Sequence, residues 1–185
     1  MSIKPSLLFK VIIAGDACVG KTTLLHRYIE GRFSFDTKMT IGSDMFHKMV
    51  LLKDGRACSL QIWDFGGQER FRFLLDQFVR GAFGAFLMYD LTQRTSFNNL
   101  PEWEAFLRQY DITLPIILLG GKYDLEDSIE VDDDSAIKFM KKYNISGFYK
   151  VSSKTEYNIK EVFEALTYTI INHLGLNNIN ESCET

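Results

Sequence analysis

The most informative segment of the chain is an octapeptide near its N-terminus. Residues 15–22 read Gly-Asp-Ala-Cys-Val-Gly-Lys-Thr, the pattern G-x-x-x-x-G-K-[ST], between the apolar run Leu7–Ala14 and a helical stretch, Thr22–Glu30. The glycines let successive backbone N–H groups point inward, and the following helix adds the N–H groups of its first turn. Lys21 is expected to reach the β- and γ-phosphates, and the Thr22 hydroxyl to bind Mg²⁺. The motif therefore predicts a site for the polyphosphate of a nucleotide.

A second group of polar residues follows another apolar run. Residues 63–71 read Trp-Asp-Phe-Gly-Gly-Gln-Glu-Arg-Phe, so a carboxylate stands at a strand end with two glycines shortly after it. Asp64 suits a Mg²⁺ site because this small, hard cation prefers oxygen ligands and keeps part of its water shell. Gly67 can offer its N–H to a γ-phosphate and lose that contact on hydrolysis, and Gln68 can orient a water for in-line attack. The two segments together predict hydrolysis of a nucleoside triphosphate.

The elements that position these segments alternate between apolar runs and amphipathic stretches. The strand-like runs are Leu7–Gly15, Met45–Leu52, Ala57–Trp63, Ala82–Asp90, Pro115–Gly121 and Phe148–Ser152. This alternation predicts an α/β fold with a six-stranded, mostly parallel sheet and helices on both faces. The pair Asp54-Gly55 predicts a hairpin, so the second and third strands are expected to be antiparallel. Ligands bind beyond the carboxyl ends of such strands, where both motifs lie.

Two finer packing predictions follow from periodicity. Between positions 57 and 62 apolar and polar residues alternate, which is typical of a half-exposed strand. The last helical stretch carries an apolar stripe that is expected to pack into the core rather than to bind a cofactor. The stripe consists of Ile159, Val162, Phe163, Leu166, Ile170 and Leu174.

Size and charge exclude several classes of protein. The chain has 185 residues, 46% of them hydrophobic, which suits one domain with a well-buried core. We expect this domain to span residues 1–176, followed by a short polar tail, 177–185. The net charge of −3 provides no basic field for nucleic acid, so nucleic acid is not an expected partner.

Cysteine content and hydropathy point to a cytoplasmic protein. Cys18, Cys58 and Cys183 are too few and too scattered for a disulfide framework, and there is no CxxC pair. The longest apolar runs, such as Ala85–Tyr89, are far shorter than the roughly 20 residues that span a bilayer. The chain is therefore expected not to cross a membrane.

With these motifs in order along the chain, the sequence resembles the Ras-superfamily small GTPases, and most of all the Rab branch. The resemblance covers the chain up to about residue 174. It rests on Gly15–Thr22, Thr40-Ile41-Gly42, Trp63–Phe71, Arg80-Gly81-Ala82, Tyr89-Asp90-Leu91-Thr92, Ser96-Phe97-Asn98-Asn99 and Ser152-Ser153-Lys154. It implies the G domain of the P-loop NTPases, with Mg²⁺ and GTP or GDP as ligands, and a molecular switch in signalling and vesicle trafficking.

The resemblance also implies a role for each matching residue. Phe33 packs an aromatic edge against guanine, while Thr40 supplies a hydroxyl to Mg²⁺ and an N–H to the γ-phosphate. Asp124, beside Lys122, accepts hydrogen bonds from the guanine N1–H and 2-amine, which adenine lacks. The implied nucleotide-binding set is Gly15, Asp16, Ala17, Cys18, Val19, Gly20, Lys21, Thr22, Thr23, Phe33, Thr40, Gly67, Lys122, Asp124, Ser152, Ser153 and Lys154. The implied metal ligands are Thr22, Thr40 and Asp64, and the implied catalytic residues are Gln68, Lys21 and Thr40.

The chain departs from the family pattern within the motifs. Gly121 stands where the family has Asn, a side chain that ties the base loop to the phosphate loop, so we expect weaker nucleotide binding and faster release. Phe65-Gly66 replaces the usual Thr-Ala and is similar to the Arf branch, which predicts a more mobile second switch. Ala17 replaces a glycine of Ras, and we interpret it as compatible with activity.

Membrane attachment is a further difference from most Rab relatives. Cys183 is third from the end and outside a C-a-a-X box, and Met1-Ser2 lacks the glycine needed for myristoylation. We therefore expect no lipid anchor of the usual kinds.

Slow GTP hydrolysis is the predicted activity, with a partner protein supplying an arginine to accelerate it. Effectors, exchange factors and GTPase-activating proteins are the implied partners. An alternative is a nucleotide-gated scaffold that binds weakly and hydrolyses little, although Gln68, Thr40 and Asp64 argue against it. A small-molecule kinase is a third alternative, but the arginines are too dispersed for an acceptor pocket.

Overall fold

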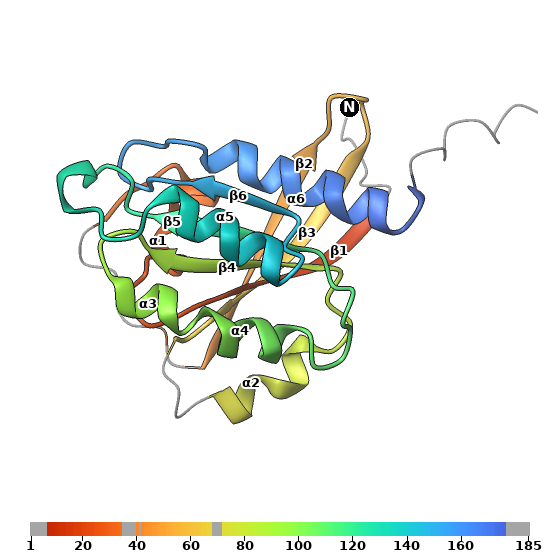
Figure 1. The fold of residues 1–185 in the computed structure, drawn as a ribbon. Helices are drawn as coiled ribbons and strands as arrows, with labels where there is room; N and C mark the ends of the chain where they lie inside the picture. Colours follow the sequence, from red (N-terminus) through yellow and green to blue (C-terminus); the bar gives the residue numbers. More distant parts are fainter. Residues whose placement is uncertain (1–6, 35–39, 41, 68–71, 177–185) are drawn as a thin grey trace, which may run out of the picture.

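The computed structural model describes residues 7–34, 40, 42–67 and 72–176. Strands and helices alternate along most of the chain (Figure 1). The strands are β1 (Leu7–Ala14), β2 (Ser43–Leu51), β3 (Ala57–Phe65), β4 (Gly84–Asp90), β5 (Ile116–Gly121) and β6 (Gly147–Lys150). The helices are α1 (Lys21–Glu30), α2 (Arg72–Val79), α3 (Arg94–Asn98), α4 (Leu100–Leu107), α5 (Asp133–Lys142) and α6 (Ile159–His173), with a 3-10 turn at Glu126–Ser128.

The sheet has the predicted topology. Its six strands follow the order β2-β3-β1-β4-β5-β6. The β2–β3 pair is antiparallel, and every other neighbouring pair is parallel. The turn between β2 and β3 closes through a hydrogen bond from the Leu52 N–H to the Arg56 carbonyl, 2.9 Å, and Gly55 adopts φ 85° within it. The hairpin prediction at Asp54-Gly55 is therefore confirmed.

Helices cover both faces of the sheet, as predicted (Figure 1). On one face, Val11 and Ile13 of β1 pack with Leu24 of α1 and Phe163 of α6. On the other face, alternate residues of the same strands pack against α2, α4 and α5 in a second core. Strands buried on both faces read as nearly continuous apolar runs, which explains why β1, β4 and β5 are apolar apart from Lys10 and Asp90.

Local signals set the ends of two helices near the pocket. The helix α1 stops at Gly31, which adopts φ 68° and donates its N–H to the Arg27 carbonyl at 3.0 Å. At the start of α5, the Asp132 carboxylate accepts the Ser135 N–H at 2.6 Å, the usual N-cap arrangement.

Two of the packing predictions need correction. The strand β3 is not half-exposed, because Ala57 and Ser59 are 4% and 3% exposed. They are small residues on an interior strand, and the His47 ring of β2 hydrogen-bonds the Ser59 hydroxyl across that face. Leu174 does not belong to the buried stripe, because α6 ends at His173 and Leu174 is 39% exposed. The other stripe residues are buried as predicted.

The carboxyl ends of β1, β3 and β5 lie at one edge of the sheet, as parallel pairing through β1 and β4 requires. The loops that follow these strands therefore meet there. In the described parts of the chain, the helices are all too short or too polar to span a bilayer.

Candidate functional site

The loop between β1 and α1 depends on glycine at its two ends. Gly15 and Gly20 adopt φ 142° and 104°, and a Cβ at Gly15 would lie 2.0 Å from the Met88 carbonyl oxygen. Between them Cys18 also has a positive φ, 64°. Gly20 is the N-cap of α1 and has no side chain with which to bond the helix's first N–H groups. These N–H groups line a natural anion site at a helix N-terminus.

Lys21 supplies a buried positive charge to this loop. It is 5% exposed, and its Nζ donates to the carbonyl oxygens of Gly15 at 2.8 Å and Asp16 at 2.7 Å. Burial lowers the pKa of Lys21 to about 8, although Asp64, Asp16 and Cys18 oppose the shift. A phosphate bound here would favour the charged form, because it brings negative charge to a desolvated ammonium group.

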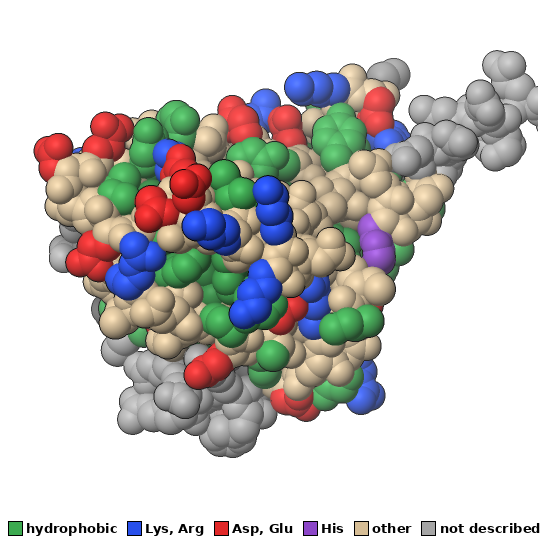
Figure 2. Space-filling view, in the orientation of Figure 1, with side chains coloured by type: hydrophobic (Ala, Val, Ile, Leu, Met, Phe, Trp, Pro, Cys, Tyr) green, Lys and Arg blue, Asp and Glu red, His purple; other side chains and the backbone are tan. Residues whose placement is uncertain are grey.

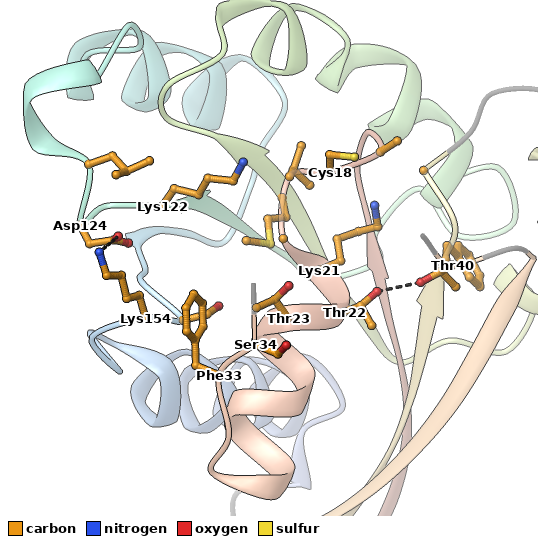
Figure 3. Close-up of a pocket in the computed structure, with 18 residues that line it drawn as sticks. Cys18, Lys21, Thr22, Thr23, Phe33, Ser34, Thr40, Lys122, Asp124 and Lys154 are labelled. Atoms are coloured by element: carbon orange, nitrogen blue, oxygen red, sulfur yellow. Dashed lines mark hydrogen bonds and ion pairs between the residues drawn. The ribbon is translucent and has the colours of Figure 1, made fainter. Parts of the chain in front are cut away.

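Three oxygen-bearing side chains meet beside Lys21. The hydroxyls of Thr22 and Thr40 lie 2.8 Å apart (Figure 3), and both donate to Oδ2 of Asp64, from Thr40 at 3.3 Å. Asp64 is fully buried, and this burial raises the pKa of its carboxyl against the opposing effects of Thr22 and Lys21. Its Oδ1 has no hydrogen-bond partner among the described residues. A buried, partly unpaired carboxylate with two hydroxyls fits a Mg²⁺ ion that completes its shell with water and phosphate.

Of the two glycines after β3, Gly67 lies directly on the phosphate loop and Gly66 lies against Thr40 and Gly42. A Cβ at Gly67 would come 2.1 Å from the Ala17 nitrogen, and one at Gly66 would come 2.6 Å from the Thr40 carbonyl oxygen. The Gly66 N–H also donates to the Gly42 carbonyl at 2.8 Å. Neither position has room for a side chain in this arrangement. Gln68, the predicted water-positioning residue, lies outside the described residues.

The other end of the pocket carries the predicted base contacts. Asp124 accepts a hydrogen bond from the Ser152 hydroxyl at 2.6 Å, and Lys154 Nζ lies 3.8 Å from its Oδ2 (Figure 3). Lys122 forms an ion pair at 2.7 Å with the fully buried Asp90 of β4. These contacts orient the two charged residues of the base motif.

Arg27 of α1 holds the loop that carries Ser153 and Lys154. Its guanidinium donates to the carbonyl oxygens of Ser153 at 2.7 Å and Lys154 at 3.2 Å. It also pairs with the Glu156 carboxylate at 2.7 Å and lies 5.8 Å from the centre of the Phe33 ring. One side chain thus connects the base loop with the aromatic residue expected at the guanine.

These groups surround a single cavity of about 450 Å³, a size suited to a small ligand. It is lined by Ala17, Cys18, Val19, Gly20, Lys21, Thr22, Thr23, Phe33, Ser34, Thr40, Phe65, Gly67, Met88, Lys122, Asp124, Leu125, Ser153 and Lys154. Almost all of the predicted nucleotide-binding residues are brought together here. Asp64 stands behind Thr22 and Thr40 through the hydrogen bonds above.

Three predicted residues support the cavity without lining it. Gly15 closes onto Met88, and Ser152 is fully buried behind Asp124. The Asp16 carboxylate accepts hydrogen bonds from Asn99 and from the indole of Trp103, both at 2.8 Å. This contact fastens the phosphate loop to α4.

Sequence reasoning did not assign Ser34, Phe65, Met88 or Leu125 to the lining. Ser34 and Leu125 adjoin predicted residues, so their position could have been inferred from adjacency. Phe65 stands out in the sequence only as a departure from the family pattern in the second motif. No feature of the sequence distinguishes Met88, because it occupies one position within the apolar run of β4.

The geometry agrees with the comparisons with known proteins. The model of the Ras family matches residues 10–172. The Ras-related protein RABA4b of Arabidopsis thaliana is 38% identical over 177 residues, covering 95% of this chain and 78% of the relative. The Ypt/Rab-type GTPase YPT7 of Saccharomyces cerevisiae is 37% identical over 172 residues, covering 90% of this chain and 83% of the relative.

A third relative extends the same pattern. The Ras-related protein Rab-7a of Paramecium octaurelia is 38% identical over 169 residues, covering 89% of this chain and 82% of the relative. Together, the family match, the identities and the arrangement of the phosphate loop, the acidic residue Asp64 and the base motif lead to one conclusion: the chain belongs to the Ras family of small GTPases.

Proposed function

We propose that GTP or GDP binds in this cavity with its phosphates over Lys21 and its base between Phe33 and Asp124. As a Ras-family GTPase, the chain binds guanine nucleotides, hydrolyses GTP to GDP and acts as a molecular switch. The observation that carries the residue assignment is the meeting of Lys21, the Thr22–Thr40–Asp64 group and Asp124 around one cavity.

At the phosphate end we assign Thr22, Thr40 and Asp64 to Mg²⁺. Bound there, the ion would neutralise phosphate charge and organise the β- and γ-oxygens. Lys21 stabilises negative charge that develops on the phosphates, from a position where water is excluded. The backbone N–H groups of the loop 15–22 also stabilise this negative charge.

Switching, in this proposal, depends on the backbone that faces the γ-phosphate. Thr40 and Gly67 come from different segments of the chain. The Thr40 hydroxyl lies beside that of Thr22, and Gly67 lies against the phosphate loop. With GTP bound, both segments are held, and loss of the γ-phosphate releases them. Gln68 follows Gly67 directly and is assigned to orient the attacking water.

Guanine selection is assigned to Asp124. Its carboxylate is oriented by Ser152 and faces the cavity, where it would accept from the guanine N1–H and 2-amine. Adenine has neither donor, so its binding would leave a charged acceptor unpaired. Lys154 and Phe33 then supply the faces against which the base packs.

Partners and boundaries complete the proposal. The chain binds regulators of the kind that Ras-family GTPases use. We propose that these partners are an exchange factor, effectors and an activating protein that donates an arginine. We propose a G domain at 1–176, with 177–185 as a polar tail lying outside the described residues. A role in vesicle trafficking fits the Rab resemblance.

The first test is to identify the nucleotide that the protein carries. Protein purified in Mg²⁺ buffer is denatured, and the released nucleotide is separated by ion-exchange chromatography and counted. We expect GDP or GTP at close to one per chain. An adenine nucleotide would overturn the role of Asp124, and an empty pocket would indicate the weak binding expected from Gly121 and favour the scaffold alternative. Single-turnover hydrolysis of GTP then separates an active switch from a scaffold that binds without hydrolysing.

A further inference from the structure

Met88 occupies the space next to the missing side chain at Gly121. Gly121 ends β5, and Met88 lies on the neighbouring strand β4 with 2% of its surface exposed. A Cβ built on Gly121 would come 2.5 Å from the Met88 Cε and 3.1 Å from the Val19 carbonyl oxygen. A contact below 3 Å is too close for two carbon atoms, so a side chain at 121 and the present Met88 rotamer exclude each other.

The same methionine lies near both ends of the phosphate loop, with its backbone at Gly15 and its side chain at Gly20. A Cβ at Gly15 would lie 2.0 Å from the Met88 carbonyl oxygen, and one at Gly20 would lie 3.5 Å from its Cε. Met88 also lines the nucleotide cavity. It therefore lies between the phosphate loop and the start of the base motif, which begins at Gly121.

We propose that Met88 is a positioning residue that couples the phosphate loop to the base loop in place of a side chain at position 121. The inference rests on the proposed function, because it assigns a nucleotide to this cavity. A flexible thioether chain fills an irregular gap well and holds its neighbours by close packing. Such a contact has no preferred direction, so it permits more relative movement of the two loops than a hydrogen bond does.

The proposal predicts that asparagine at position 121 harms nucleotide binding unless Met88 is also made smaller. The terminal methyl group of Met88 would have to leave its place, and the open side next to it is the nucleotide cavity. Gly121→Asn alone should therefore speed nucleotide release. In the double variant Gly121→Asn with Met88→Val, the shorter side chain leaves room, and the amide can reach the Val19 carbonyl.

The experiment measures release of a fluorescent GDP analogue from wild type, both single variants and the double variant at fixed Mg²⁺. We expect each single variant to release the analogue about tenfold faster, and the double variant to release it more slowly than either, as coupled neighbours do. Release rates that multiply in the double variant would overturn the proposal. Met49→Val is the matched control, because this exposed methionine of β2 lies outside the cavity and its substitution should leave the release rate unchanged.

A second measurement separates this inference from the proposed function. Thermal melting of the nucleotide-free proteins should show the same pattern, with the double variant melting above Gly121→Asn. If wild type bound no guanine nucleotide, the proposed function would fail, while melting would still test the Met88–Gly121 coupling. Rescue of melting without rescue of release would overturn the positioning role, because it would indicate core packing alone.

Discussion

The phosphate end and the base end of the pocket are held in place in different ways. At the phosphate end, Lys21 bonds carbonyl oxygens five and six residues before it in the chain. At the base end, Arg27 bonds Ser153 and Glu156, which are 126 and 129 residues away. The contacts of Lys21 are thus local, although Thr22 and Asp16 of the same end also bond distant residues, whereas the base loop is held by Arg27 only when α1 packs beside the loop after β6.

Backbone conformation differs between the two ends as well. Glycines occupy the strained positions Gly15 and Gly20 of the phosphate loop, where a side chain is costly. In the base region, Lys122 and Glu156 adopt φ 61° and 65° although they carry side chains. Lys122 pairs with the buried Asp90, which helps to hold a conformation that costs of order 1 kcal/mol or more, whereas Glu156 pairs with Arg27 in a more exposed position. Positive φ is therefore carried mainly by glycine at the phosphate end, with Cys18 as the exception, and by residues with side chains at the base end.

The largest effect is expected from a substitution at the phosphate end. Lys21→Met removes a buried charge that faces the phosphates, and we expect GDP affinity to fall by about 10³-fold or more. Isothermal titration calorimetry measures the affinity for GDP. Lys10→Met is the control, because Lys10 lies on β1 beneath Trp63 and not in the cavity. Similar losses in both variants, or a loss below tenfold at Lys21, would contradict the assignment.

The next effect changes which base the pocket selects. Asp124→Asn replaces an acceptor of two hydrogen bonds by an amide, so guanine loses affinity by about 10²-fold or more. Xanthine has a carbonyl at position 2, and its nucleotide should bind the variant better than it binds wild type. Competition with a fluorescent GDP analogue measures both preferences. Asp127→Asn, in the exposed 3-10 turn, should change neither, and equal losses for the two bases would argue against direct recognition.

A smaller effect is expected from removing the Arg27 contacts that hold the base loop. Arg27→Met leaves two carbonyl oxygens and the Glu156 carboxylate without their donor, so the loop around Lys154 should loosen. We expect GDP to dissociate about tenfold faster, which corresponds to roughly 1.4 kcal/mol. Stopped-flow fluorescence with the GDP analogue measures this dissociation rate. Arg32→Met is the control, since that side chain is 80% exposed, and equal rates in the two variants would refute this role of Arg27.

The smallest effect sharpens the comparison of backbone strain. Glu156→Gly removes the cost of a positive φ, and it also removes an ion pair whose carboxylate is 63% exposed and therefore contributes little. The free energy of unfolding should change by less than about 1 kcal/mol. Glu156→Gln loses the charge but keeps the strain, so it should be the less stable of the two in urea denaturation. The reverse order would mean that the ion pair dominates.

Much of the fold was predictable because it rests on local patterns. The runs at β1, β4 and β5 are apolar enough to indicate strands buried on both faces, and Asp54-Gly55 marks the antiparallel hairpin. The exceptions were Ser59, whose burial depends on the neighbouring strand's His47, and Leu174, which follows the last helical residue. Periodicity does not report what an adjacent strand places over a side chain, nor the residue at which a helix ends.

The candidate site divides in the same way. The sequence by itself predicted the phosphate loop and the acidic residue Asp64, because their chemistry depends on residue type and close spacing, and its resemblance to small GTPases predicted the base motif at Asp124. Only the tertiary structure decided that Arg27 holds the base loop and that Met88 fills the space beside Gly121. The physical reason is that these contacts join segments distant in sequence, and side-chain packing between strands and helices leaves no periodic mark on the chain.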